Sequence, residues 1–204
     1  LALQVGANFA NDLSDFRRGA DNSTRIGPPR VTQLGLLSQR QVLAGLLVSF
    51  ALASVAGVYL TYIGGWPIIA IGLASILAAV TYTGGPWPFG YRGLGELFVF
   101  IFFGLVAVSG TYYVQAGEVT GHVLAASIPV GLTVTASLVV NNVRDIETDR
   151  KADKRTLAVR FGSTFAEWQF VAAHVVGVVA LTVLWRGGLW GTVSWAILSL
   201  VALI

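Results

Sequence analysis

Long apolar runs dominate this chain and restrict what it can fold into. They are 40–62, 66–83, 94–115, 122–142, 164–184 and 190–204. A run of about 20 apolar residues can cross a bilayer as a helix, because a helix rises about 1.5 Å per residue over roughly 30 Å of hydrocarbon. Charged residues are only 11% of the chain, against about 25% in a soluble domain. The sequence therefore predicts an all-α bundle of transmembrane helices.

A further apolar segment at 1–10 is expected to be the end of another span. The chain opens and stops inside apolar segments and contains no Met. We therefore predict that residues 1–204 form a single transmembrane domain, truncated at both ends. Ser38 and Thr164 are each followed three residues later by Gln or Glu, which is the capping-box pattern of a helix start.

Two acid-rich stretches, 8–15 and 141–155, lie where apolar runs end. Their acids are spaced three or four residues apart, so on a helix they share one face. These acids are Asp12 and Asp15 in the first stretch, and Asp145, Asp149 and Asp153 in the second. Asn8 and Asn141 each precede the first acid by one turn. Unpaired like charges in such a row repel, so we expect a cation to neutralise them.

The distribution of charge predicts the orientation in the membrane. Four helices separate the two acidic stretches, so both are expected on the same face. Of the 13 Lys and Arg residues, only Arg186 is expected on the other face. The positive-inside rule makes the basic face cytoplasmic. The net charge of +3 then reflects topology and contact with membrane lipid, so no nucleic acid is expected. His122 and His174 are expected on or near the opposite face, as ordinary packing residues.

Carboxylates at two helix ends can clasp a hard cation through oxygen ligands. Mg²⁺ suits such a site, because it usually takes one or two carboxylates together with phosphate oxygens. The nearby cations could hold those phosphate oxygens directly. They are Arg25, Arg30, Lys154 and Arg155. Carboxylate, Mg²⁺ and flanking Arg or Lys stabilise a departing diphosphate.

Other readings of the chain remain open. The acids could simply pair with neighbouring Lys and Arg at solvated helix ends, although two such stretches on one face argue against this. A transporter or channel predicts ionisable residues in the middle of spans, which these runs essentially lack. A quinone- or lipid-binding membrane protein without catalysis would not require the carboxylate pairs.

The two acidic stretches resemble those of the UbiA superfamily of intramembrane prenyltransferases. The likeness rests on 8–30 (NFANDLSDFRRGADNSTRIGPPR) and 141–162 (NNVRDIETDRKADKRTLAVRFG). It extends over almost the whole chain, including 82–91 (YTGGPWPFGY) followed by Gly95 and Glu96. Three shorter segments resemble the branch of the superfamily that acts on 1,4-dihydroxy-2-naphthoate. They are 19–21, 25–30 and 154–160.

The resemblance implies a helical bundle of about nine spans around a central cavity, of which this chain covers a part. It implies Mg²⁺-dependent transfer of a polyprenyl group from polyprenyl diphosphate to 1,4-dihydroxy-2-naphthoate. The ring would lose CO₂ and give demethylmenaquinone, for menaquinone synthesis in a bacterial cell membrane. The implied Mg²⁺ ligands are Asn8, Asp12, Asp15, Asp145 and Asp149. Other branches, such as one acting on 4-hydroxybenzoate, share the acidic motifs.

The remaining expected site residues contact the substrates. The candidates for the diphosphate or the acceptor are Asn8, Asn11, Arg25, Arg30, Asn142, Arg144, Lys154 and Arg155. Tyr82 is expected to join the four aspartates as a catalytic residue, because an aromatic ring can stabilise a carbocation. The rings of Trp87, Phe98, Phe102 and Phe103 are further candidates. Many relatives carry Tyr-x-x-x-Lys, but Pro86 follows Tyr82 at that spacing and Arg92 is the nearest cation.

Overall fold

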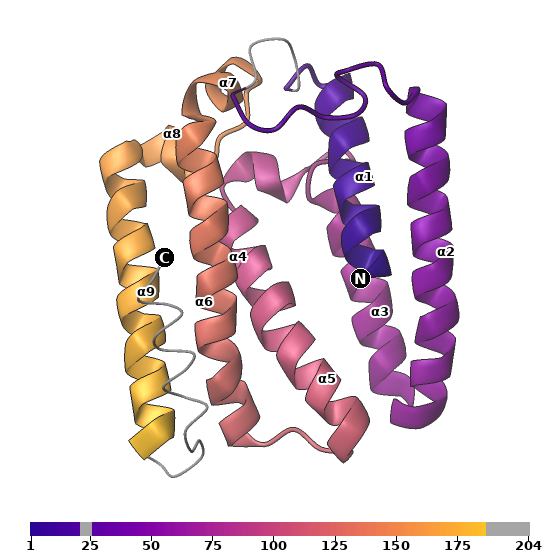
Figure 1. Ribbon diagram of the computed structural model, residues 1–204, viewed down its shortest axis with the longest axis vertical. Helices are drawn as coiled ribbons and strands as arrows, with labels where there is room; N and C mark the ends of the chain where they lie inside the picture. Colours follow the sequence, from indigo (N-terminus) through magenta and orange to yellow (C-terminus); the bar gives the residue numbers. More distant parts are fainter. Residues whose placement is uncertain (21–25, 187–204) are drawn as a thin grey trace.

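The computed structural model describes residues 1–20 and 26–186, which contain helices and connecting loops but no strand (Figure 1). The elements are α1 (Ala2–Arg17), α2 (Gln39–Gly64), α3 (Trp66–Thr81), η1 (Phe89–Arg92), α4 (Gly95–Val99), η2 (Phe100–Val106), α5 (Ala107–Ala116), α6 (Gly121–Arg144), α7 (Ile146–Lys151), α8 (Leu157–Phe161) and α9 (Ser163–Arg186). The predicted all-α class is confirmed.

Four helices in the described residues are long and apolar enough to cross a membrane. They are α2, α6, α9 as far as Leu184, and the continuous helix Gly95–Ala116 that α4, η2 and α5 form. Helix α3 is apolar but shorter, at 16 residues. It ends at Thr81, before the predicted limit of 83, because the turn that contains Gly84, Gly85 and Pro86 follows at once. The expected run 190–204 lies outside the described residues.

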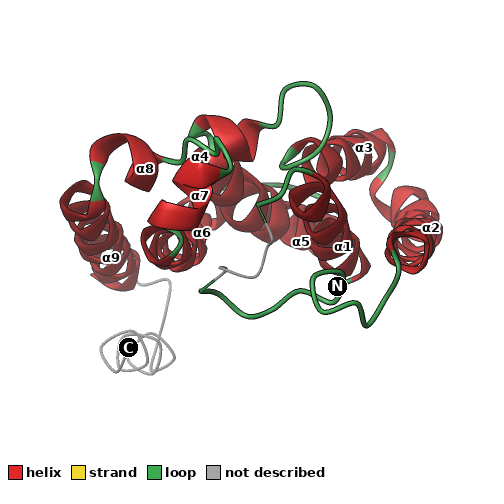
Figure 2. Ribbon diagram, turned by 90° about the horizontal axis from the view of Figure 1, so that it is seen from above, coloured by secondary structure: helices red, strands yellow, loops and turns green. Residues whose placement is uncertain are grey.

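The long helices stand side by side, and the acidic ends of two of them lie at one end of the bundle. Helix α1 packs on α2, and α6 packs on both α9 and η2. Helices α1 and α6 both end at the top of Figure 1, where α7 and α8 also lie. Viewed from that end, the loop before α2 runs across the front of the bundle (Figure 2). The fold therefore brings both acidic stretches to the same end.

Local sequence signals set several helix boundaries. The predicted capping box at Ser38 is confirmed: its hydroxyl accepts from the Gln41 N–H, and the Gln41 side chain accepts from the Ser38 N–H at 2.9 Å. Helix α9 begins at Ser163, one residue before the predicted start at Thr164. The preceding Gly162 has a φ of +86°, a conformation that suits glycine and separates α9 from α8.

Two glycines allow the helix containing η2 to lie directly against α6. A Cβ added to Gly104 would be 2.6 Å from the Cα of Gly131, so neither position has room for a side chain. Small residues permit this kind of close backbone approach between membrane helices. Segment η2 is π-helical, a form that shifts the register of a helix locally. This contact sets the position of α4 relative to the end of α6.

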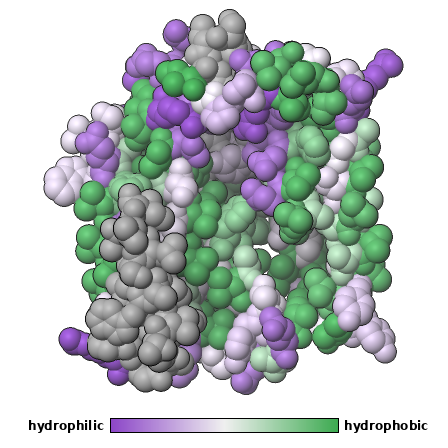
Figure 3. Space-filling view, viewed as in Figure 1, coloured by the Kyte–Doolittle hydropathy of each residue, from purple (hydrophilic) through white to green (hydrophobic). Residues whose placement is uncertain are grey.

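Large apolar side chains cover the outside of the bundle. Leu47, Val55 and Leu73 are among many that are more than half exposed. In Figure 3 the hydrophobic residues cover the flanks, while hydrophilic residues gather at the top of the visible face. Exposed apolar surface of this extent requires lipid or other apolar partners. With the four apolar helices, it identifies an integral membrane protein.

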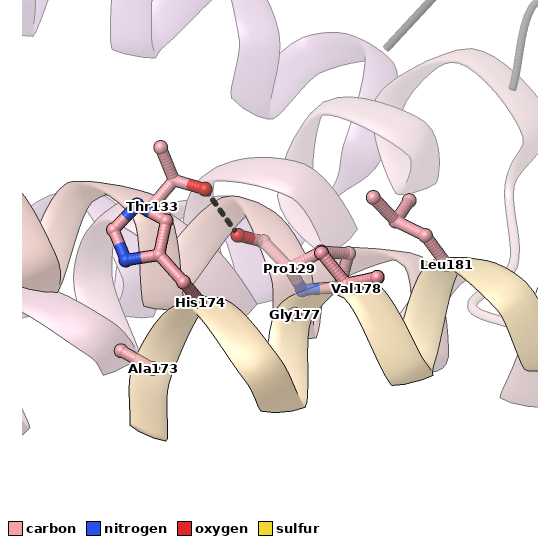
Figure 4. A pocket seen from close by; sticks show the side chains of 7 residues that line it. All are labelled: Pro129, Thr133, Ala173, His174, Gly177, Val178 and Leu181. Atoms are coloured by element: carbon pink, nitrogen blue, oxygen red, sulfur yellow. Dashed lines mark hydrogen bonds between the residues drawn. The ribbon is translucent and has the colours of Figure 1, made fainter. Parts of the chain in front are cut away.

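A very small cavity lies between α6 and α9, far from the acidic ends (Figure 4). Pro129 lies inside α6 and cannot donate a helix hydrogen bond. Its carbonyl accepts from the Thr133 hydroxyl at 2.9 Å, and the neighbouring His174 ring bonds the Phe170 carbonyl. Pro129 is 16 residues before Asp145, or about 24 Å along a helix. His174 lies in the middle of α9, so the prediction that it lies on or near the opposite face is wrong.

Candidate functional site

The last turns of α1 bury both acids of the first stretch. Asp12 and Asp15 are each only 4% exposed. Burial raises the pKa of the Asp12 carboxyl, although the Arg30 guanidinium and hydrogen bonds from the backbone N–H groups of Thr32 and Val31 oppose the shift. One oxygen of Asp12, Oδ1, is buried without a hydrogen-bond partner. A buried carboxylate oxygen without a partner is costly, so this position suits an added ligand.

Tyr91 of η1 lies at the junction of the two acidic stretches. Its buried hydroxyl donates to Oδ1 of Asp15 at 2.9 Å. Two cations face its ring: Arg18 from the end of α1, and Lys154 from the second stretch, at 5.2 and 5.7 Å from the ring centroid. Burial and the neighbouring Asp15 carboxylate raise the pKa of the Tyr91 hydroxyl. Tyr91 therefore stays protonated and keeps its donor directed at Asp15.

The acids of the second stretch are buried at the end of α6 and in α7. Both oxygens of Asp145 accept from the Arg144 guanidinium, from Nε at 2.8 Å and Nη2 at 2.7 Å. Asp149 lies one turn later, and its Oδ1 is 3.2 Å from Nζ of Lys154. The other oxygen, Oδ2, is buried and has no partner. Each stretch thus contains one buried carboxylate oxygen that is free to accept.

Asp15 and Asp149 are close enough to repel each other. Burial raises the pKa of the Asp149 carboxyl to about 6, although the Lys154 ammonium opposes the shift; the charges of Asp145 and Asp15 raise it further. Asp15 and Asp149 are 134 positions apart in the sequence, so only the tertiary fold produces this interaction. The two acidic stretches therefore belong to one electrostatic site.

Asp153 does not share the face of Asp145 and Asp149, so this part of the prediction is wrong. The chain leaves the helix after Lys151, and Asp153 has a φ of +52°. Its side chain is 82% exposed and pairs with Arg155 at 3.0 Å. The i, i+4, i+8 spacing places three acids on one face only along an uninterrupted helix, and the helix stops before the third acid.

The loop before α2, described from residue 26, contacts both acidic stretches. Arg30 interacts with Asp12 of α1. Gly27 lies against the Arg144 side chain of α6, where an added Cβ would be 2.7 Å from Nη2. A side chain at Gly27 would displace the guanidinium that holds Asp145. Predicted residue Arg25, like Asp21, lies outside the described residues.

Tyr82 is half-buried near the same carboxylates. Gly90 lies against its ring and Gly95 against its hydroxyl, at 3.1 and 2.9 Å from an added Cβ. Burial raises the pKa of Tyr82, and the charges of Glu96, Asp15 and Asp149 raise it further. The two glycines thus hold a protonated phenol close to both acidic stretches.

The asparagines of the two stretches have different surroundings. Asn8 is exposed on α1. Asn11 accepts from the hydroxyl of the buried Thr83 at 3.0 Å, which ties α1 to the turn after α3. Asn142 is buried and donates from Nδ2 to Oε1 of Glu96 in α4 at 3.0 Å.

The remaining expected residues lie apart from the acids. The Arg155 side chain is mostly exposed on Asp153, although its backbone N–H donates to the Tyr91 carbonyl at 2.8 Å. Arg92 stacks on Trp87 at 5.2 Å. An apolar groove of about 510 Å³ runs between α3 and α4, with Trp87, Phe98 and Phe102 in its lining. Phe103 is not among the residues that line this groove and is 38% exposed.

Sequence reasoning did not assign a site role to three residues that the fold places here. Tyr91 and Thr83 lie in the segment 82–91, which carried part of the family likeness but offered no charge pattern. Glu96, which follows this segment, likewise entered only as part of the family likeness. The available signal was a polar residue within an otherwise apolar or glycine-rich segment, since such a residue is usually buried with a partner.

The carboxylate oxygens at this site fit a hard cation only if another molecule, such as a phosphate compound, supplies further oxygen ligands. No group of three or more His, Asp or Glu side chains among the described residues converges closely enough to hold a metal alone. Yet Asp12 Oδ1 and Asp149 Oδ2 are buried acceptors without partners. Mg²⁺ commonly combines one or two carboxylates with phosphate oxygens and waters, which is the arrangement that these residues permit.

The sequence of this chain is similar to those of known proteins. The profile of the UbiA prenyltransferase family matches residues 1–204. A 1,4-dihydroxy-2-naphthoate octaprenyltransferase of Mycobacterium tuberculosis is 42% identical over 99% of this chain and 67% of its own length. The protein of that name from Haemophilus influenzae is 42% identical over 80% of this chain and 55% of its own length.

A more distant relative is the human UbiA prenyltransferase domain-containing protein 1. It is 31% identical over 81% of this chain and 49% of its own length. The chain thus spans about half to two thirds of the length of these relatives. No solved structure matches the chain.

Proposed function

Because the chain belongs to the UbiA prenyltransferase family, we propose that the protein containing it transfers a polyprenyl group from polyprenyl diphosphate to an aromatic acceptor. The observation that carries the proposal is the meeting of two buried acidic helix ends, with Asp15 and Asp149 within electrostatic range and cations around them. Charge that develops on a departing diphosphate is stabilised by such preorganised cations.

The proposed acceptor is 1,4-dihydroxy-2-naphthoate, with loss of CO₂ and formation of demethylmenaquinone for menaquinone synthesis. Support comes from the names of the relatives at 42% identity. The segments 25–30 and 154–160, which suggested this branch from the sequence, flank the acids in the chain. A 4-hydroxybenzoate acceptor is the alternative that shares the same acidic site.

Mg²⁺ is the proposed cofactor. Asp12 and Asp149 are the best-supported ligands, because each has a buried carboxylate oxygen without a hydrogen-bond partner. Asp15, Asp145 and Asn8 complete the set implied by the family resemblance. When bound, the ion would draw negative charge onto the diphosphate oxygens and so favour cleavage of the allylic C–O bond. Each oxygen of Asp145 accepts one hydrogen bond from Arg144 and keeps a further lone pair, so Asp145 could contribute while the guanidinium stays in place.

The cations have distinct proposed roles. Lys154 is mostly buried between Asp149 and the Tyr91 ring, so it can hold a phosphate oxygen without a large movement. Arg30 and Arg144 lie where the loop before α2 meets α1 and α6, and either can bind the diphosphate or the acceptor carboxylate. Arg25 and Arg155 stay predictions as further diphosphate ligands.

The allylic carbocation must be kept from water once the diphosphate departs. The ring of Tyr82, held beside the acids by two glycines, is the proposed aromatic group facing it. The apolar tail would remain among the helices or in lipid. The proposed location is a bacterial cell membrane with the site on the cytoplasmic face, on the basis of the Lys and Arg distribution.

The direct test uses the full-length protein in nanodiscs with Mg²⁺ and a short allylic diphosphate. The naphthoate and 4-hydroxybenzoate are offered separately, and product is identified by mass spectrometry. We expect a prenylated, decarboxylated naphthoate product that is lost on adding a chelator and restored by Mg²⁺. Product from the benzoate alone would move the protein to another branch. Failure to consume diphosphate with either acceptor would refute the proposal.

A further inference from the structure

A buried polar pair connects the start of α4 to the end of α6. Asn142 donates from Nδ2 to Oε1 of Glu96 at 3.0 Å, and each residue is only 6% exposed. Oε1 of Glu96 is the acceptor, so the NH₂ group of Asn142, and not its carbonyl oxygen, faces Glu96. This bond fixes which way the amide faces.

The surroundings connect this pair to the acidic site. The Tyr82 hydroxyl lies against Gly95 and within electrostatic range of Glu96. Lys154, which pairs with Asp149, also attracts the Glu96 carboxylate. The second oxygen of Glu96, Oε2, is buried without a partner. A preference of acids for helix starts explains why Glu96 suits the first turn of α4, but not its bond to another helix.

The orientation of the amide has a chemical consequence. With Nδ2 held by Glu96, the carbonyl oxygen Oδ1 of Asn142 points away from Glu96 and accepts no hydrogen bond from any described side chain. An amide oxygen is a ligand type that suits a hard cation or the water bound to it, whereas an NH₂ group would repel the cation.

We propose that Glu96 is a positioning residue for the acidic site: it holds the Asn142 amide so that its oxygen, and not its NH₂ group, is available to the cation and diphosphate. This inference rests on the proposed function, because that function supplies the ligand. Glu96 itself does not contact the substrate in this account.

The test exploits the near-identical shapes of Glu and Gln and of Asn and Asp. In Asn142→Asp two carboxylates oppose each other across the pair, and we expect diphosphate affinity and kcat to fall about 10-fold or more. Glu96→Gln can present either its oxygen or its NH₂ group, so the orientation is no longer unique and a loss of about threefold is expected. The double variant restores the hydrogen bond with its direction reversed: the side-chain NH₂ group at position 96 donates to a carboxylate oxygen at position 142. The second oxygen at position 142 then takes the place of the Asn142 amide oxygen.

The double variant should therefore recover most of what Asn142→Asp loses. Binding of inorganic diphosphate in the presence of Mg²⁺ is measured by calorimetry on the full-length protein in nanodiscs, alongside kcat and KM for prenyl transfer. Thermal unfolding verifies that each variant is folded. Glu118→Gln, which changes an exposed acid in the loop between α5 and α6, is the matched control and should match wild type.

Four outcomes separate the positioning role of Glu96 from the proposed function. A double variant no better than Asn142→Asp would overturn the positioning role, as would wild-type binding and turnover in Asn142→Asp. Wild-type protein that binds Mg²⁺ and diphosphate without transferring a prenyl group would contradict the proposed function, while the binding cycle still judges Glu96. Absence of wild-type diphosphate binding would overturn both.

Discussion

At the scale of single residues, the acidic site combines burial with incomplete pairing. Asp149 has one oxygen on Lys154 and one without a partner, and Asp12 also keeps an unpartnered oxygen. Such groups destabilise the protein when no ligand is present, because desolvation is not fully offset. A site of this kind gains most when a cation and an anion bind together.

The raised pKa of Asp149 gives a prediction about stability and pH. The folded protein holds this proton more tightly than the unfolded chain does, so the stabilisation is fully present below about pH 4 and is lost as pH rises through about 6. At 1.36 kcal/mol per pKa unit, the stability of wild type relative to Asp149→Asn should fall by roughly 2.5 kcal/mol between pH 4 and pH 7. Unfolding in detergent with a chelator present measures it, and parallel pH curves would contradict the assignment.

Tyr91 gives a second prediction at this scale. Tyr91→Phe leaves Oδ1 of Asp15 buried without its donor, which costs about 1–3 kcal/mol of stability. Because Asp15 also belongs to the proposed site, kcat for prenyl transfer should fall about 10-fold. Tyr62→Phe, at a side chain that is 91% exposed, is the control. Equal unfolding temperatures and rates for the two variants would show that the Tyr91 hydroxyl has no role.

At the scale of helices and loops, apolar runs and capping patterns predicted the helices, whereas the irregular segments between helices could not be predicted. The apolar runs and the Ser38 capping box predicted α2 closely, because hydrophobic length and capping act locally. The break between Lys151 and Asp153 was missed, since no glycine or proline marks it. The partners of Tyr91 and Glu96 were also missed, because they depend on how the 82–94 segment folds against α1 and α6.

The contact between η2 and α6 provides a test at this scale. A methyl group at Gly104 would meet Gly131 at 2.6 Å, so Gly104→Ala must separate the two helices, at a cost of about 1–3 kcal/mol. A Cβ at Gly72 in α3 would meet nothing within 4 Å, so Gly72→Ala should be neutral or stabilising by up to about 1 kcal/mol. Thermal unfolding in detergent compares them, and similar melting temperatures would contradict the packing account.

At the scale of the whole molecule, alternation of helices brings both acidic stretches to one end. Counting crossings predicted this common face, because each span reverses the direction of the chain. The charge bias adds the prediction that this face is cytoplasmic. The distances between the stretches could not be predicted, since helix length and charge do not determine how helices pack laterally.

Residues 1–204 contain no Cys, so single cysteines introduced there test the orientation once any cysteine elsewhere in the full-length protein is replaced. Leu36 lies in the loop at the acidic end and Val119 in the loop at the opposite end, and both are exposed. A membrane-impermeant maleimide should label Val119→Cys in intact cells and Leu36→Cys only after permeabilisation. The reverse pattern would place the acidic site outside the cell.

The central claim is that the two acidic stretches form one catalytic site, and a double-mutant cycle tests it most directly. Asp12→Asn, Asp145→Asn and the double variant are made in the full-length protein, with Glu147→Gln, an exposed acid of the second stretch, as control. The measurement is kcat/KM for Mg²⁺-dependent prenylation of 1,4-dihydroxy-2-naphthoate. We predict that each Asp variant loses at least about 100-fold and that the double variant loses little more, because residues acting as a unit are not additive. Full activity in either folded Asp variant, or losses that simply multiply, would contradict a shared site.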